Sequence, residues 1–355
     1  MRLPPWIVLI AGLGLTVVAA AAPLSNSRYQ VELADDGALR VTARAAGTTL
    51  SFRPEFTVLV TREDPKLAMR PSGLKQVSFN VMTWETKNAG AAQLQASKRS
   101  TAQGGDGFDD RILDGSTKAR TADVFASAPN VVVTATKWEQ TNDAICYTFT
   151  DTADFALSAT VTLPHDDADV ASEPVLTFTL TPKTKAFFSV GYTGAPTVAT
   201  GEAEEFWQPF VWQEKRFPHQ SFLTGAFQCP VPASFVRRDG VTFGVVVDAD
   251  EFPFDPLPLL ENSRFGVALR TPEGSARPMA FAPILGGAGS RRASGEAFSL
   301  KLRLYATKGD ATVAYEDVAR RLYAFRDYRS NAIASLNETL DNMIDYGMSH
   351  FSWFV

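Results

Sequence analysis

The segment from Glu204 to Phe222 holds the residues whose types best suit ligand chemistry. Its sequence is EEFWQPFVWQEKRFPHQSF. Sugars present apolar C–H faces that stack on aromatic rings, and their hydroxyls bond to amide, carboxylate and guanidinium groups. The candidate sugar-binding residues are therefore Trp207, Gln208, Trp212, Glu214, Arg216 and His219. The alternative is that Trp207 and Trp212 fill the gap between a sheet and the helical end of the chain.

Catalysis by these residues is a separate question. Exchange at a sugar's anomeric carbon needs a histidine acid beside a carboxylate base. The chain has three histidines, and the best available pairing is His219 with Glu214 or Glu205. Nothing in the spacing requires that pairing, so the sequence assigns no catalytic residue.

Two acidic clusters have the composition of calcium ligands. GGDGFDD, from Gly104 to Asp110, matches the start of a calcium-binding turn, and HDDAD begins at His165. A single copy of such a turn lacks the stacked neighbours that complete the oxygen shell. Solvated acidic loops are the favoured interpretation and no cofactor is required, with Ca²⁺ as the alternative ligand of Asp106, Asp109, Asp110, Asp166, Asp167 and Asp169.

The chain has two cysteines, Cys146 and Cys229. Neither belongs to a CxxC pair, which disfavours a zinc site or a thiol nucleophile. A disulfide between them and a pair of buried free thiols both remain open, because spacing alone cannot show how close their Cα atoms come.

The N-terminus has the pattern of a secretory signal. Met1-Arg2 is followed by an apolar run from Trp6 to Ala22 that ends in small residues. This predicts a signal peptide over residues 1–22, a periplasmic or extracellular protein, and no membrane attachment after cleavage, with a retained membrane anchor as the alternative. The formal charge of −5 without a basic block disfavours nucleic acid as a partner.

Short alternating runs of β-branched and aromatic residues fill most of the chain from Arg28 to Tyr305. Each run is closed by Pro, Gly, Asp or Asn, which is typical of antiparallel strands. The first two are joined by Asp35-Asp36-Gly37, a hairpin signal. We predict a mainly β protein, a large antiparallel β-sandwich (supersandwich) over residues 23–309.

The pattern becomes helical after Gly309. Val318, Leu322 and Phe325 recur at helical spacing, with Asp310 or Thr312 as the cap. A second stripe, capped by Ser330 or Asn331, contains Ile333, Leu336, Leu340, Met343 and Ile344. We assign residues 310–355 to a linker helix and the start of a helical domain, and favour truncation of that domain. The aromatic end predicts packing through Phe351, Trp353 and Phe354 on a helical domain, on a partner or on the sandwich itself.

The stretch VAYEDVARRLYAFRDYRSNAIASLNETLDNMIDYGM is similar to the linker and first toroid helix of six-hairpin glycoside hydrolases. The order of elements also resembles that class, in which a galactose-mutarotase-like supersandwich precedes an (α/α)6 toroid. The resemblance implies that catalytic carboxylates lie in the toroid, mostly outside this chain. It favours an exported carbohydrate-binding or carbohydrate-processing protein, the non-catalytic N-terminal part of such an enzyme.

Two other classes of function remain open from the sequence. One is a stand-alone aldose epimerase or polysaccharide lyase, which requires a cleft where a histidine faces a carboxylate. The other is a structural or assembly module that docks through its hydrophobic C-terminus.

Overall fold

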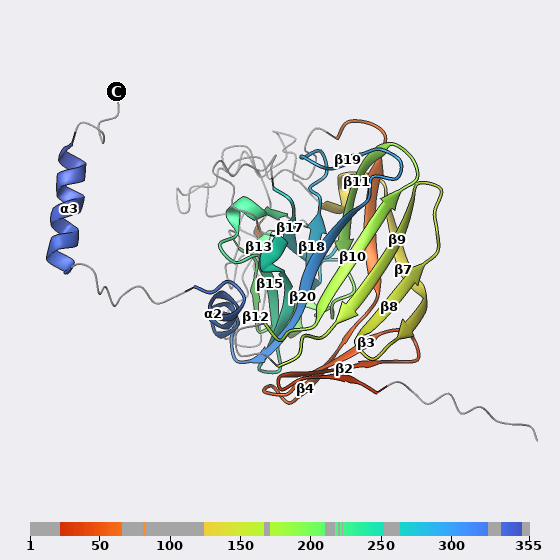
Figure 1. Ribbon diagram of the computed structural model, residues 1–355, viewed down its shortest axis with the longest axis horizontal. Coiled ribbons are helices and arrows are strands. Elements are labelled where there is room, and N and C mark those ends of the chain that lie inside the picture. The colour runs from red at the N-terminus through yellow and green to blue at the C-terminus, as the bar shows by residue number, and fades with distance from the viewer. Residues whose placement is uncertain are drawn as a thin grey trace, which may run out of the picture.

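The computed structural model describes residues 22–65, 81–82, 124–166, 171–209, 217–218, 221, 223–251, 263–325 and 335–349. The predicted signal peptide and the aromatic residues Phe351, Trp353 and Phe354 lie outside these ranges. Within them the chain is mainly β, with antiparallel pairing throughout the named ladders. The predicted fold class, a large antiparallel sandwich followed by a short helical segment, is confirmed (Figure 1).

A small sheet opens the fold. It consists of four strands in chain order: β1 (Leu24–Ser25), β2 (Tyr29–Leu33), β3 (Leu39–Ala43) and β4 (Thr48–Phe52). The predicted hairpin joins β2 to β3, and Gly37 adopts φ +80° in its turn. A Cβ at Gly37 would lie 2.7 Å from the Trp138 ring, so only glycine lets this turn approach the large sheet.

The large sheet contains the other long strands. Its hydrogen-bonded order is β12-β15-β16-β20-β10-β9-β8-β7-β5-β11-β18-β17-β14, with β19 paired to β11. The bounds are β5 Glu55–Thr61, β7 Asn130–Gln140, β8 Ala144–Phe149, β9 Phe155–Thr162, β10 Val175–Pro182, β11 Ala186–Tyr192, β12 Glu205–Trp207, β14 Thr224–Gly225, β15 Ala233–Arg238, β16 Val241–Val247, β17 Gly266–Arg270, β18 Ala276–Ala282, β19 Arg291–Arg292 and β20 Phe298–Lys308. A separate pair joins β6 (Val81–Met82) to β13 (Phe217–Pro218).

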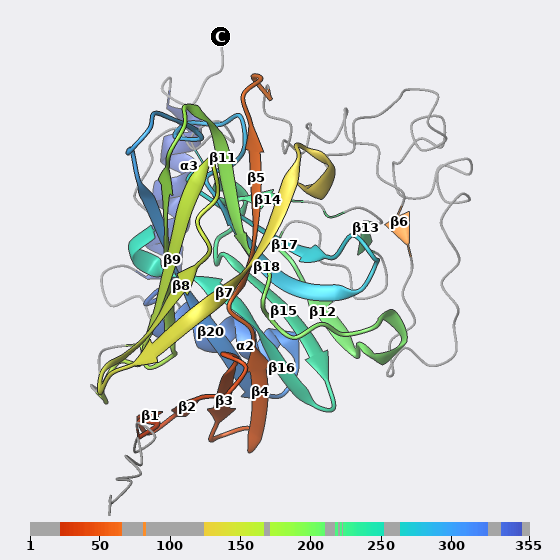
Figure 2. The same ribbon diagram turned by 90° about the vertical axis from the view of Figure 1, so that its right-hand side faces the viewer.

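The large sheet folds over on itself at β7. The first half of β7, up to Thr134, pairs with β5, and the second half, from Ala135, pairs with β8. The register shifts between Ala135 and Lys137, and such bulges bend a strand and increase its twist. One long strand therefore belongs to both layers, and the sheet curls into a sandwich (Figure 2).

Phe56 lies at the centre of the core between the two layers. Its ring centroid is 5.4 Å from those of Phe149, Phe178 and Tyr192, which come from both halves of the sheet. All four rings are buried, in tilted, edge-to-face packing of the kind that aromatic rings favour. The small sheet contributes Tyr29 and Val41 to the same cluster. It thus packs against the sandwich as part of one core.

Helix α2 (Ala311–Arg321) covers the outer face of β15, β16 and β20 (Figure 1). Asp310 is its cap, as predicted, and accepts a hydrogen bond from the Val313 N–H at 2.9 Å. Val318 and Leu322 are buried against Phe235 and Val246, whereas Phe325 lies beyond the helix and is half exposed.

Helix α3 (Leu336–Met348) begins later than the sequence suggested. Its cap is Ser335, whose hydroxyl accepts from the Glu338 N–H at 3.1 Å, and Ser330 and Asn331 lie outside the described residues. No residue of α3 is buried. Neither of the two described α-helices combines the length and the apolar character needed to cross a membrane.

Candidate functional site

The structure places two of the six predicted sugar-binding residues, and both contact other elements of the fold. Trp207 ends β12, and its ring lies 4.9 Å from the ring of Tyr315 on α2. Gln208 is buried, and its amide donates to Thr224 Oγ1 at 2.9 Å and to the Val267 carbonyl at 3.1 Å. Trp212, Glu214, Arg216 and His219 lie outside the described residues. The contact of Trp207 with α2 matches the alternative prediction that this ring braces the helix.

Glu205, one of the two carboxylates considered for His219, belongs to β12, and its side chain contacts the N-terminal end of α2. Its Oε1 pairs with Arg237 Nη1 at 3.0 Å, and its Oε2 accepts from the Ala311 N–H at 2.9 Å. A carboxylate at this end of a helix offsets the positive end of the helix dipole. Both oxygens of Glu205 therefore have partners in the helix and the sheet.

Of the candidate calcium ligands, only Asp166 falls within the described ranges. Its two oxygens accept from the Ser27 N–H at 2.9 Å, and hydrogen bonding first from the side chain and then from the backbone of Ser27 lowers the pKa of the exposed carboxyl. Asp106, Asp109, Asp110, Asp167 and Asp169 are outside those ranges. Among the residues that are placed, no three His, Cys, Asp or Glu side chains gather as a metal site.

The cysteines do not form the disulfide that the sequence left open. Both are free thiols: Cys146 is exposed on β8, and Cys229 is buried behind β14. The Cys229 Sγ lies 3.4 Å from the Gly225 carbonyl, and burial raises the pKa of its thiol. The prediction of two buried thiols is also wrong for Cys146, because its side chain points to the solvent face of β8.

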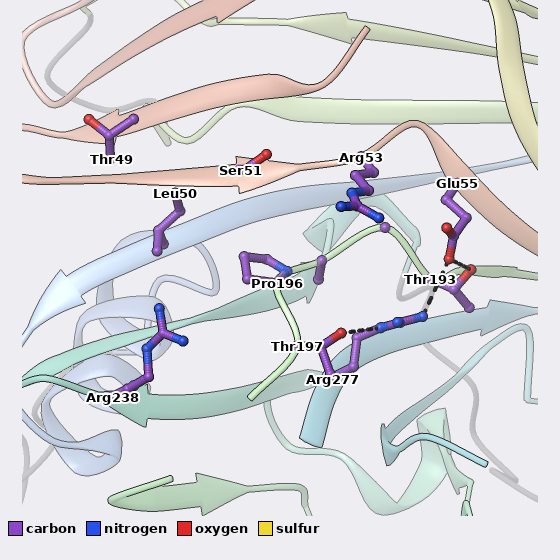
Figure 3. A pocket seen from close by; sticks show the side chains of 12 residues that line it. Thr49, Leu50, Ser51, Arg53, Glu55, Thr193, Pro196, Thr197, Arg238 and Arg277 are labelled. Atoms are coloured by element: carbon purple, nitrogen blue, oxygen red, sulfur yellow. Dashed lines mark hydrogen bonds and ion pairs between the residues drawn. The ribbon is translucent and has the colours of Figure 1, made fainter. Parts of the chain in front are cut away.

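A pocket of about 420 Å³ lies between the small sheet and the large one (Figure 3). Ligand sites in proteins commonly enclose roughly 300–1,000 Å³. We call it the arginine pocket, and its lining residues are Thr49, Leu50, Ser51, Arg53, Glu55, Thr193, Gly194, Ala195, Pro196, Thr197, Arg238 and Arg277.

The segment from Thr193 to Val198 forms one wall of the arginine pocket and is fixed at both ends. The Thr193 N–H donates to the Glu55 carbonyl at 3.0 Å, and Val198 exchanges two backbone hydrogen bonds with Ala276 at 2.8 and 2.9 Å. Between these points the Gly194 carbonyl accepts from the Arg53 N–H at 2.7 Å. A Cβ at Gly194 would lie 1.8 Å from the Arg53 carbonyl oxygen, so this approach excludes any side chain.

Arg277 and Glu55 form a fixed polar pair on one side of the pocket. Arg277 Nη1 lies 3.3 Å from Glu55 Oε1, and its Nε donates to Thr197 Oγ1 at 2.7 Å (Figure 3). Thr193 Oγ1 also donates to Glu55 Oε1 at 3.4 Å. Both charged side chains are only partly exposed, at 26% and 21%, so each is constrained by several partners.

Arg53 and Arg238 are held much less firmly. The exposed guanidinium of Arg53 forms no ion pair with any described residue. Arg238 reaches Glu202 at 3.7 Å and Asp239 at 3.5 Å, both through exposed groups that water screens. Figure 3 shows the two guanidinium groups on either side of Pro196.

Tyr192 is fully buried next to this wall, at the end of β11. Burial first, then electrostatic interaction with Tyr147 and after it with Glu55, raise the pKa of its phenol. Tyr192 is thus a neutral group at physiological pH, and the ionic character of the site comes from the arginines and Glu55.

The pocket offers guanidinium, carboxylate and hydroxyl groups beside the apolar side chains of Leu50 and Pro196. Such a surface can hydrogen-bond a polar ligand while it covers an apolar face of that ligand. Sequence reasoning missed this site because its residues come from four separate segments, 49–55, 193–197, Arg238 and Arg277. Arg277 and Glu55 are 222 positions apart, and no local motif connects them.

Comparisons with known proteins find similarity at the level of fold. No family model and no curated protein sequence matches the chain. An alpha-mannosidase from Enterococcus faecalis V583 is 10% identical with a TM-score of 0.39, and the match covers 84% of this chain and 30% of that one. A glycosyl hydrolase family 38 protein from Enterococcus faecalis gives the same identity and TM-score, with 32% of its chain covered.

A galactose 1-epimerase from Lactobacillus acidophilus NCFM is 10% identical with a TM-score of 0.28, covering 79% of this chain and 95% of that one. The chain spans about a third of the length of the two Enterococcus chains. Sequence identities and TM-scores this low do not allow any residue role or activity to be assigned to this chain. The solved structures it resembles are a glycoside hydrolase, an alpha-mannosidase and a galactose 1-epimerase, and the likeness is confined to the fold.

Proposed function

We propose that this protein is an exported carbohydrate-binding protein and forms the non-catalytic N-terminal part of a glycoside-hydrolase-like enzyme. The observation that carries the proposal is the arginine pocket, a concave site of about 420 Å³ with converging polar groups. Its polar groups are guanidinium, carboxylate and hydroxyl, which are the types that bond to sugar hydroxyls.

The fixed pair of Arg277 and Glu55 suits a sugar in particular. A sugar hydroxyl can donate one hydrogen bond and accept others at the same time. Arg277 supplies donors only and Glu55 supplies acceptors only, and the two groups lie 3.3 Å apart. Neighbouring hydroxyls of one sugar ring can therefore bond to both groups. Because the pair is already held by Thr193 and Thr197, little ordering is needed on binding.

Helix α3 supports the second part of the proposal. Leu340, Met343 and Ile344 lie on one side of it with exposed fractions of 45%, 65% and 61%. Apolar side chains grouped in this way mark an interaction surface. A helical domain packed on α3 would remove them from water. The reading frame downstream of Val355 tests this part, and a stop codon there would count against it.

The binding role is tested with a glycan array, followed by NMR titration of the best ligand into the isotope-labelled protein. Arg277→Met removes the fixed donors, and we expect it to weaken binding by about tenfold, the usual effect of one charged hydrogen bond. Arg62→Gln is the matched control, since Arg62 is an exposed arginine at the far end of β5.

Three outcomes separate the alternatives. Loss of binding in Arg277→Met alone supports the arginine pocket. Loss in Trp207→Ala alone would place the sugar at the Glu204–Phe222 segment. A folded protein that binds no glycan would refute the binding role.

Export is a proposal that depends on the apolar run before Pro23. N-terminal sequencing of the protein recovered from expressing cells checks it. We expect the chain to start at about residue 23; an intact Met1 would contradict export by this route.

A further inference from the structure

The arginine pocket is positively charged on a protein that is negatively charged as a whole. Its lining contains three guanidinium groups and one carboxylate, whereas the formal charge of the chain is −5. Neutral sugars need hydrogen bonds from a site but no net charge. The excess of arginine over carboxylate therefore indicates a preference for the charge of the ligand, which the proposed function alone does not specify.

Arg53 contributes the charge that is least compensated. It follows β4 directly, and its position is fixed by the backbone rather than by its side chain, through the Arg53 N–H and the Gly194 carbonyl. The side chain is exposed, lines the pocket and forms no ion pair with the residues that the structure describes. A guanidinium in this state can take both oxygens of an incoming carboxylate or sulfate as a bidentate pair.

Arg238 supplies a second charge across Pro196. Its contacts with Glu202 and Asp239 are 3.7 and 3.5 Å long, and those carboxylates are 57% and 71% exposed. Exposed pairs of this kind contribute little, so the Arg238 guanidinium can turn to a ligand at small cost. Arg277, in contrast, is already neutralised by Glu55 at 3.3 Å.

The charged residues of the pocket thus fall into two groups. The pair of Arg277 and Glu55 is electrically balanced and suited to hydroxyl groups, while Arg53 and Arg238 carry positive charge suited to an anion. Leu50, which is buried, forms an apolar part of the lining between the small sheet and Pro196. A ligand that matches all three parts has hydroxyls, an apolar ring face and a negative group.

We propose that the arginine pocket binds the anionic group of an acidic carbohydrate, a carboxylate or a sulfate, between Arg53 and Arg238. This inference rests on the proposed carbohydrate-binding function and adds the charge of the ligand to it. The pair of Arg277 and Glu55 then orients the hydroxyls of the same sugar.

The experiment is an NMR titration of the full chain with four separate probes: glucuronate, sulfated glucose, glucose and sodium sulfate. We expect one of the two acidic sugars to bind at least about tenfold more tightly than glucose, the usual effect of one charged hydrogen bond. Raising the salt concentration weakens that binding, because it screens charges at an open site. Comparison of glucuronate with sulfated glucose identifies the anionic group.

The variants are Arg53→Gln, Arg53→Lys and Arg238→Gln, with Arg62→Gln as the control. Arg53→Gln should abolish the preference for the acidic sugar. Arg53→Lys should keep part of that preference, because lysine retains the charge but cannot form the bidentate hydrogen bonds of a guanidinium. Arg53 is exposed, so these variants are expected to fold, and thermal unfolding checks this.

The outcomes distinguish this inference from the proposed function. Equal binding of glucose and both acidic sugars, unchanged in Arg53→Gln, overturns the anionic ligand and leaves carbohydrate binding intact. Binding of sodium sulfate as tight as that of the acidic sugars overturns the carbohydrate and keeps an anion site. No binding of any probe refutes both.

Discussion

The two cysteines differ in the properties that govern thiol reactivity. Cys146 is exposed on β8, whereas Cys229 is buried and surrounded by backbone carbonyls, the nearest at 3.4 Å. The thiolate is the reactive form, and burial raises the pKa of the Cys229 thiol, which keeps it protonated. Only one of the two thiols should therefore react in the folded protein.

We predict that a thiol-specific reagent at neutral pH modifies one cysteine in the native protein and both in denaturant. Peptide mapping by mass spectrometry should identify Cys146 as the native site, and Cys146→Ser should remove the native reaction. A protein without titratable thiols would instead contain the disulfide.

Among the elements, α2 and α3 differ in how they are held. Helix α2 is attached by ionic groups as well as by apolar packing. Asp317 accepts from Tyr305 at 2.8 Å and from Arg321 at 2.7 Å, and Arg28 lies 3.3 Å away. Arg321 also pairs with the buried carboxylate of Glu173. Helix α3 has no buried side chain, so its row of apolar residues contributes nothing to the core.

The pH dependence of stability should report on Asp317. Burial raises the pKa of this carboxyl, but hydrogen bonds and charge from Arg321, with Tyr305 and Arg28, more than offset that effect and lower it. A lowered folded pKa means that the stabilisation is present above the unfolded value of about 4 and is lost as the pH falls through the folded value. The free energy of unfolding should thus decrease in acid.

Asp317→Asn should reduce the free energy of unfolding at neutral pH by roughly 1–3 kcal/mol, because it weakens charged hydrogen bonds. Its stability should also depend less on pH below about 4. Urea unfolding across a pH series measures both effects. Glu316→Gln is the control: it breaks the exposed pair with Arg320 and should change stability by less than about 1 kcal/mol. Equal effects of the two variants would contradict the role of Asp317.

At the scale of the whole molecule, the sandwich depends on contacts between its two layers. Phe56 on β5 touches Phe149 on β8 and Phe178 on β10, each at 5.4 Å between ring centroids. These strands lie in different halves of the curled sheet, so the rings hold the layers together. The arginine pocket depends on the same packing, because Glu55 precedes Phe56 in β5.

Phe56→Ala should lower the free energy of unfolding by about 3–5 kcal/mol, the usual cost of a large cavity in a core. Val132→Ala, at an exposed position of β7, should change it by less than about 0.5 kcal/mol. Urea unfolding followed by tryptophan fluorescence compares the two. A similar, small effect of both variants would show that the layers are held together elsewhere.

The strands that the sequence predicted well are those in which side chains alternate between core and solvent. Phe155–Thr162, which is β9, and Val175–Pro182, which is β10, have this alternation of buried and more exposed side chains. Strand β18 departs from this pattern, because it is almost continuously buried and contains Pro278, which has no N–H for the ladder. The structure accommodates Pro278 where the register between β17 and β18 shifts.

Local chemistry along the chain determined the strands, the hairpin at Gly37 and the cap at Asp310, since each depends on neighbouring residues. Tertiary structure alone decided the arginine pocket. Its charged residues come from three distant segments, which hold Arg53 with Glu55, Arg238, and Arg277 and meet only when the sheet curls at β7 and the small sheet packs against it. Pairing between distant strands is set by the packing of the whole core, so no short pattern could predict which arginines would meet.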